Sequence, residues 1–191
     1  NRLLISGLVL LVILLGCWLM VKNWAVTPYG KLDTRTAIIL KLANLTAKPG
    51  PAPAPAEMRA RDEKFNKLLD DEQTPVNRVI NQDIPGSAGA IPVRIYVPEN
   101  SGPLPVVLYF HGGGYIAGSP QSHSALIRAL VRRSQCRVVA PKYALGPDSV
   151  LPAAQNDARA AWNALIDSGV PAAQVVLAGA SAGGGTALSL M

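Results

Sequence analysis

The stretch VVLAGASAGGG, residues Val175–Gly185, decides the fold that the sequence predicts. It begins as an apolar, β-branched run typical of a buried strand and passes directly into glycines that surround one serine, Ser181. We expect a helix to open after Ser181, so that the serine lies where a strand turns into a helix. Glycines fit such a turn because neighbouring backbone segments come into contact there and leave no room for Cβ atoms.

Residues 179–183, GASAG, match the pattern G-x-S-x-G. In this pattern a strained turn exposes the serine hydroxyl at the carboxyl ends of parallel strands, where it can act as a nucleophile. The helix that follows directs its first N–H groups and the positive end of its dipole toward the reacting centre, which favours a developing oxyanion. Alone the pattern is weak, because a glycine-rich turn without chemistry explains it as well.

A second motif, HGGG at residues 111–114, directly follows the strand expected at Pro105–Phe110. Acyl transfer needs two or three preorganised N–H donors near the carbonyl oxygen as it becomes an oxyanion. Backbone amides of consecutive glycines can approach that oxygen without obstruction by side chains. The two motifs together therefore indicate a single mechanism, acyl transfer to a serine.

The motifs assign a role to each of their residues. We predict that Ser181 is the nucleophile. The backbone N–H groups of Gly112, Gly113 and Ala182 are predicted to form the oxyanion hole. The remaining motif residues are expected to support the two turns: His111, Gly114, Gly179 and Gly183.

Strands and helices alternate from Pro105 onward, which predicts an α/β fold with a mostly parallel sheet and helices on both faces. The expected strands are Val76–Ile84, Ile91–Val97, Pro105–Phe110, Arg137–Pro141 and Gln174–Ala178. The expected helices are Asp33–Ala47, Glu57–Asp71, Ser122–Arg133, Ala153–Asp167 and one after Ser181. A Pro/Ala spacer at Lys48–Ala56 separates the first two helices.

Residues 3–21 form an apolar run of 19 residues without a charge. At about 1.5 Å per helical residue the run spans the roughly 30 Å hydrocarbon core of a bilayer, which predicts a single N-terminal transmembrane helix and a membrane-anchored protein. Two alternatives remain open. One is a cleaved signal peptide, which would give a secreted or periplasmic protein, and the other is a lipoprotein signal in which LLGC presents Cys17 for acylation.

The composition argues against several classes of function. The net charge is +6, but the basic residues are scattered and aromatic residues make up only 5%, so we expect no nucleic-acid partner. The two histidines and two cysteines form no cluster with metal-ligand spacing, so we expect no metal and no cofactor. His111 is expected to hold the oxyanion loop by backbone hydrogen bonds, and His123 to be a solvated residue at the start of a helix.

The chain resembles the hormone-sensitive-lipase-like branch of the α/β-hydrolases, a family of carboxylesterases and lipases. Three ordered stretches between about Val76 and the end of the chain carry the resemblance: HGGGYIAGSPQSH at 111–123, KYALGPDSVLPAAQNDARAAWNAL at 142–165, and GASAGG at 179–184. The resemblance implies an α/β-hydrolase fold, a small-molecule ester as substrate, and a cap over the acyl pocket formed by the helix at Glu57–Asp71. Together with the apolar run, the predicted organisation is an anchor or signal segment at 1–24, linker and cap-like helices at 25–75, and the amino-terminal part of the catalytic domain at 76–191.

The sequence departs from the family pattern in three ways. Ala180 stands where the family usually has Asp, which leaves the mechanism untouched. In the loop after Pro141, the family residues Arg, Ala and Glu are replaced by Ala144, Gly146 and Asp148, which leaves the packing or pairing of this loop open. The family's triad acid and histidine follow the serine, yet the ten residues after Ser181 contain no Asp, Glu or His. We therefore expect this chain to be the amino-terminal part of a longer enzyme and to be inactive alone.

The sequence thus predicts a carboxylic ester hydrolase that works through a nucleophilic serine and an acyl-enzyme intermediate. One alternative is a catalytically inactive, membrane-tethered α/β-hydrolase that serves as a binding module. Another is a serine peptidase or amidase of the same fold, because G-x-S-x-G does not separate ester from amide chemistry.

Overall fold

The computed structural model describes residues 2–46, 50–69, 74–100 and 102–191. The chain divides into two compact units, Asn1–Ala52 and Pro53–Met191. The division falls within the Pro/Ala spacer, of which residues 48 and 49 lie outside the described ranges.

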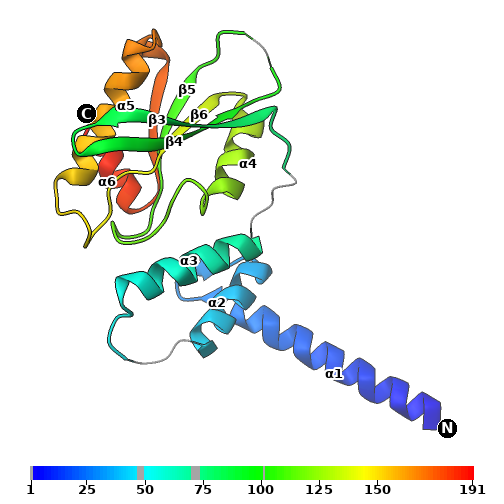
Figure 1. The fold of residues 1–191 in the computed structure, drawn as a ribbon. Helices are drawn as coiled ribbons and strands as arrows, with labels where there is room; N and C mark the ends of the chain where they lie inside the picture. The colour runs from blue at the N-terminus through cyan, green and yellow to red at the C-terminus, as the bar shows by residue number, and fades with distance from the viewer. Residues whose placement is uncertain (1, 47–49, 70–73, 101) are drawn as a thin grey trace. The chain divides into compact units, whose positions relative to one another are not determined.

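The first unit consists of two helices joined by a short hairpin (Figure 1). Helix α1 spans Arg2–Trp24, strands β1 and β2 span Val26–Thr27 and Gly30–Lys31, and helix α2 spans Thr34–Thr46. The expected start of α2 at Asp33 has a local cause. The Asp33 carboxylate accepts hydrogen bonds from the N–H groups of Arg35 and Thr36, at 3.0 and 3.2 Å, which caps the first turn.

The expectation of a membrane span requires a correction. Crossing the hydrocarbon core takes about 20 consecutive apolar residues in one helix. Within the described ranges no helix has the length and apolar character that this requires. The prediction of a transmembrane helix at residues 3–21 is therefore wrong, and with it the predicted membrane-anchored localisation.

The second unit begins with helix α3, Pro55–Leu69, and contains a sheet of five strands in the order β3-β4-β6-β5-β7. The strands are β3 (Arg78–Gly86), β4 (Gly89–Val97), β5 (Val106–Phe110), β6 (Arg137–Pro141) and β7 (Val175–Gly179). The predicted helix at Glu57–Asp71 corresponds to α3, although residues 70 and 71 lie outside the described ranges.

The sheet is mixed rather than mostly parallel. Strands β6, β5 and β7 are parallel, as the alternation after Pro105 predicted. Strand β4 is antiparallel to both β3 and β6. The antiparallel part follows from the connection, because only two residues separate β3 from β4 and so short a loop joins antiparallel strands only.

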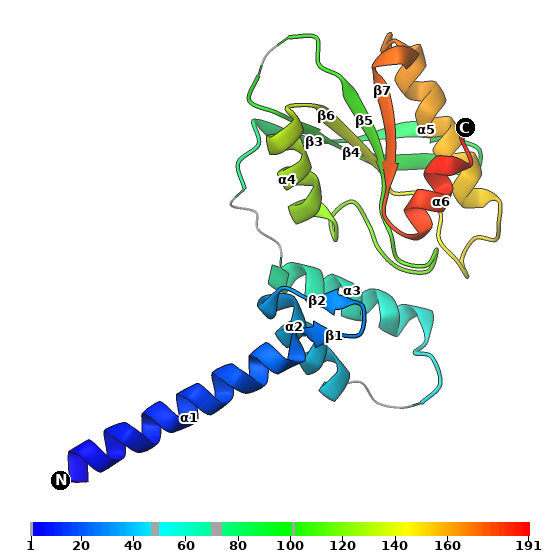
Figure 2. The ribbon, with the colours of Figure 1, turned by 180° about the vertical axis from the view of Figure 1, so that it is seen from behind.

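Helices cover both faces of this sheet (Figure 2). Helices α5 (Ala153–Asp167) and α6 (Ala182–Leu188) pack on the face that carries Leu108 and Phe110. Helix α4 (Ser124–Ser134) packs on the opposite face against Val107 and Tyr109. All five residues of β5 are buried, which explains why this central strand is apolar at every position. Because β5, β6 and β7 are parallel, the loops that follow them leave the same edge of the sheet, and the candidate site lies there.

Candidate active site

Ser181 lies on a tight turn between β7 and α6. Its backbone has φ +52° and ψ −119°, a conformation that costs energy for a residue with a side chain, and the residue is exposed. The turn is closed by the N–H groups of Gly183, bonded to the carbonyl of Ala180 at 2.8 Å, and of Gly184, bonded to the carbonyl of Ser181 at 2.9 Å. Strain at an exposed serine of this kind is typical of a nucleophile held ready for attack.

The two flanking glycines are required by space. A Cβ atom at Gly179 would overlap the carbonyl oxygen of Gly183, and one at Gly183 would overlap the carbonyl oxygens of Phe110 and His111. These obstacles are backbone atoms, which cannot move aside as a flexible side chain can. The two glycines of the G-x-S-x-G pattern are therefore needed because the turn packs closely on itself and against the end of β5.

The glycine-rich loop passes directly against this turn. A Cβ atom at Gly112 would lie 2.9 Å from the carbonyl oxygen of Ala180 and 3.5 Å from Cβ of Ser181. The N–H of Ala180 donates to the carbonyl of Phe110 at 3.1 Å, which ties the two segments together. The structure thus brings the HGGG motif into contact with the serine turn.

The three amides assigned to the oxyanion hole are not equivalent. The N–H of Gly112 donates to Nε2 of His123 at 3.2 Å, so this amide already has a partner. In the part of the chain that the structure describes, the N–H groups of Gly113 and Gly114 donate to no protein acceptor. Ala182 is the first residue of α6, and the N–H of a first helical residue has no partner within its helix.

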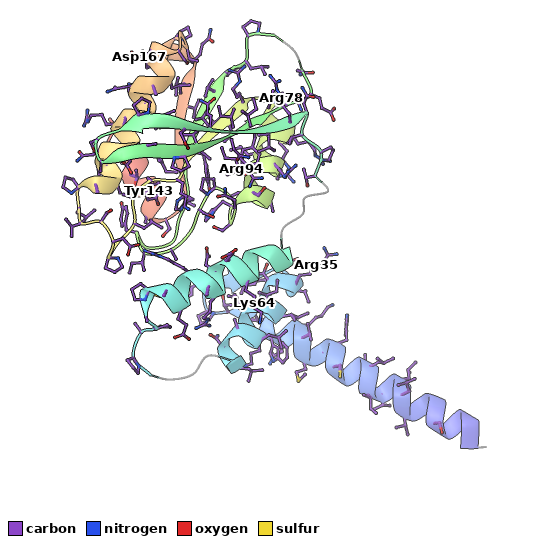
Figure 3. All side chains as sticks on the ribbon, viewed as in Figure 1. Arg35, Lys64, Arg78, Arg94, Tyr143 and Asp167 are labelled. Atoms are coloured by element: carbon purple, nitrogen blue, oxygen red, sulfur yellow. The ribbon has the colours of Figure 1, made fainter. Side chains whose placement is uncertain are left out.

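His111 is a buried structural residue with 1% of its surface exposed. Its Nδ1 lies 2.9 Å from the carbonyl oxygen of Gly112, and because that oxygen can only accept, Nδ1 carries the proton. Its ring stacks on that of Tyr143, a residue labelled in Figure 3, with the ring centroids 4.3 Å apart. The Tyr143 hydroxyl donates to the His111 carbonyl at 2.6 Å. Burial first, and then the neighbouring His123, lowers the pKa of His111 to about 4, so the ring is neutral at pH 7.

His123 is not the solvated residue that the sequence predicted. It is half-buried, and its Nε2 accepts from the Gly112 amide, which leaves the ring proton on Nδ1, 3.2 Å from Oγ of Ser122. Burial lowers the pKa of His123 as well. Both histidines of the chain are therefore engaged with the glycine-rich loop.

Three further residues hold the loops of the site, and sequence reasoning did not single out Tyr143 or Arg59 for this. Tyr143 supports His111, as described, and Asp157 accepts a hydrogen bond from the N–H of Ala144 at 2.8 Å. Arg59, on α3, donates from Nε to the carbonyl of Ile116 at 2.8 Å. The partners of Tyr143 and Arg59 lie 32 and 57 residues away, so no local spacing could reveal these contacts.

A cleft of about 830 Å³ lies between α3 and the loops after β5 and β6. Its lining carries charges of both signs, among them Arg59, Arg94, Lys142 and Asp148, and does not include Ser181. Within the described ranges no group of His, Cys, Asp or Glu side chains could hold a metal ion. The cleft thus borders the end of the glycine-rich loop, where Gly118 and Ser119 contribute to its lining.

Comparisons with known proteins agree with this geometry. A sequence model of a family described as alpha/beta hydrolase fold matches residues 107–191. Carboxylic ester hydrolase LipN of Mycobacterium tuberculosis is 38% identical over 111 residues, which cover 56% of this chain and 30% of that protein. The acetyl-hydrolase of Streptomyces hygroscopicus is 46% identical over 85 residues, which cover 44% of this chain and 28% of that protein.

Solved structures extend the similarity to a larger share of the chain. A hyperthermophilic esterase from the archaeon Pyrobaculum calidifontis is 32% identical with a TM-score of 0.72, over 85% of this chain and 51% of that one. The thermostable carboxylesterase EstE1, cloned from a metagenomic library, is 37% identical with a TM-score of 0.65, over 71% of this chain and 48% of that one. The chain spans about half the length of these two solved structures and 30% or less of the two curated relatives. The motifs, the sheet and these relatives together support the resemblance of the chain to the hormone-sensitive-lipase-like branch of the α/β-hydrolases.

Proposed function

We propose that the whole protein is a carboxylic ester hydrolase and that Ser181 is its nucleophile. The observation that carries the proposal is the strained, exposed Ser181 in contact with a loop whose Gly113 and Gly114 amides have no acceptor among the described residues. The relatives named above include a carboxylic ester hydrolase and a carboxylesterase, which supports a small-molecule ester as the substrate class of this protein.

In the proposed reaction Oγ of Ser181 attacks the ester carbonyl carbon and its proton passes to a general base. The tetrahedral oxyanion accepts hydrogen bonds from the N–H groups of Gly113 and Ala182. The amide of Gly112 can serve as a third donor only by leaving His123, whereas the amide of Gly114 needs no such exchange. The alcohol leaves with a proton from the base, and water then hydrolyses the acyl-enzyme.

The general base is proposed to be a histidine from outside residues 1–191, held by an Asp or Glu, as the family resemblance implies. Neither histidine of this chain suits the role. His111 is buried and its Nδ1–H donates to the carbonyl of Gly112, and His123 uses Nε2 to accept from the Gly112 amide. Without a base the Ser181 hydroxyl is a weak nucleophile, so residues 1–191 alone are expected to show no esterase activity.

The test uses the natural full-length protein and short-chain p-nitrophenyl esters. The wild-type protein should hydrolyse them, and Ser181→Ala should lower kcat by at least about 10³-fold, as loss of a triad serine does. Ser189→Ala is the matched control, because Ser189 is an exposed serine at the end of the same helix and should keep its activity. Equal activity of Ser181→Ala and the wild type would overturn the proposal. Hydrolysis of amides but not of esters would indicate a peptidase or amidase instead.

A further inference from the structure

We propose that Arg59 is a positioning residue that holds the oxyanion-hole loop from helix α3. It contributes no group to the chemistry, yet it fixes the turn on which the Gly113 amide depends. The inference rests on the proposed function of Ser181 and assigns a task to the helix that precedes the sheet.

The loop after β5 contains a compact turn at residues 113–117. The N–H groups of Ile116 and Ala117 both donate to the carbonyl of Gly113, at 3.1 and 2.9 Å. Nε of Arg59 donates to the carbonyl of Ile116 at 2.8 Å. The guanidinium therefore binds the far end of the same turn whose first residue supplies an oxyanion-hole amide.

Arg59 also fixes a second loop against this turn. Its Nη2 donates to the carbonyl of Gly146 at 2.7 Å, and the N–H of Gly146 donates to the carbonyl of Tyr115 at 2.7 Å. Tyr115 has φ +61°, an unfavourable value that persists only where surrounding contacts impose it. The bonds form a closed ring through Arg59, Gly146, Tyr115 and Ile116, which imposes that conformation.

The third nitrogen of the guanidinium, Nη1, lies 2.6 Å from Oδ2 of Asp148. The side chain of Asp148 is 69% exposed, so water screens this ion pair and its contribution is small. The two bonds to backbone carbonyls are partly buried and charge-assisted, which makes them the stronger part of the arrangement. Only a planar guanidinium can reach all three acceptors, because a lysine ammonium is a single compact donor group.

The proposal predicts a loss of transition-state stabilisation without a loss of substrate binding. A displaced oxyanion-hole donor lowers kcat, and a misplacement of about 1 Å costs up to about 10²-fold. In the natural full-length protein, Arg59→Lys should lower kcat about tenfold and leave KM within about twofold. The affinity for a trifluoromethyl ketone, whose serine adduct carries the oxyanion, should weaken in parallel with kcat. Arg61→Met is the matched control, since it removes an exposed arginine from the same helix and should change neither quantity.

Hydrogen exchange of the amides of residues 113–118 provides a readout that needs no activity. Arg59→Lys and Arg59→Met should both accelerate exchange there and leave exchange in β5 unchanged.

If the wild-type protein shows no Ser181-dependent hydrolysis, the proposed function fails, while the exchange rates still decide whether Arg59 holds the loop. If Arg59→Met does not fold, Arg59→Lys carries the test, with its melting temperature as a check. Unchanged exchange and kcat in Arg59→Lys, or a rise in KM with kcat unchanged, would overturn the proposal.

Discussion

The turn at residues 179–185 and the loop at residues 111–118 both depend on glycine, but different parts of the molecule hold them. The serine turn is held by backbone packing, because Cβ atoms at Gly179 and Gly183 would overlap carbonyl groups of the turn itself and of the end of β5. The glycine-rich loop also packs closely on its own backbone, but side chains from outside it hold it as well, those of His123, Tyr143 and Arg59. Backbone packing thus fixes the turn of the nucleophile, whereas the groups proposed to stabilise the oxyanion also depend on side chains that are distant in sequence.

The largest effect should come from crowding the serine turn. Gly183→Ala places a methyl group onto the carbonyl oxygens of Phe110 and His111, and we expect it to lower the free energy of unfolding by about 3 kcal/mol or more. Gly184→Ala is the matched control, because its Cβ would find its nearest neighbour, the carbonyl of Gly179, at an ordinary 3.5 Å. In a helix interior that change should be neutral or stabilising by up to about 1 kcal/mol. Urea unfolding of the two variants compares them, and equal stability would show that backbone packing does not hold this turn.

The next effect should appear with acid, through the glycine-rich loop. The pKa of His111 is lowered from 6.5 to about 4 in the folded protein, so below pH 6.5 the unfolded chain binds more protons. The stabilisation from neutral His111 is present above pH 6.5 and is lost as the pH falls toward 4. Between pH 7 and pH 5 the loss should be about 2 kcal/mol, and the half-buried His123 adds to it in the same direction. His111→Gln should reduce this pH dependence of the free energy of unfolding, and an unchanged slope would contradict the assignment.

A smaller effect should separate two buried tyrosines. Tyr143→Phe removes the donor to the buried His111 carbonyl and should destabilise the protein by about 1–3 kcal/mol. Tyr109→Phe removes a buried hydroxyl that has no hydrogen-bond partner among the described residues, so it should be neutral or stabilising. Thermal melts of both variants give the comparison. If Tyr109→Phe lowers the melting temperature more than Tyr143→Phe does, the hydrogen bond from Tyr143 does not stabilise the loop as described.

Much of the fold could be predicted from local sequence. The first and last residues of β6 and α5 are those that the sequence predicted, because hydrophobic periodicity and turn residues are local signals. The HGGG and G-x-S-x-G motifs lie in contact, as expected for two parts of one site. The antiparallel hairpin at β3 and β4 was not predicted, since the alternation rule was applied from Pro105 onward only. The membrane span was predicted from hydropathy alone and was wrong.

The outside support of the glycine-rich loop could not be predicted. His123 reads in the sequence as an ordinary helix start, and Arg59 as one of several charges on a polar helix. Their roles depend on tertiary contacts with residues 11 and 57 positions away in the sequence, and such contacts produce no periodic pattern in the sequence. Asp148 departs from the family pattern, and the structure shows that its carboxylate pairs with Arg59.

The most direct test of the account is labelling of the natural full-length protein with a tagged fluorophosphonate, which captures only an activated serine, followed by mass spectrometry of the labelled peptide. We expect a single adduct on Ser181, absent from Ser181→Ala and retained in Ser189→Ala. Folded full-length protein that remains unlabelled, or an adduct on another serine, would contradict the assignment of Ser181 as the nucleophile of a hydrolase.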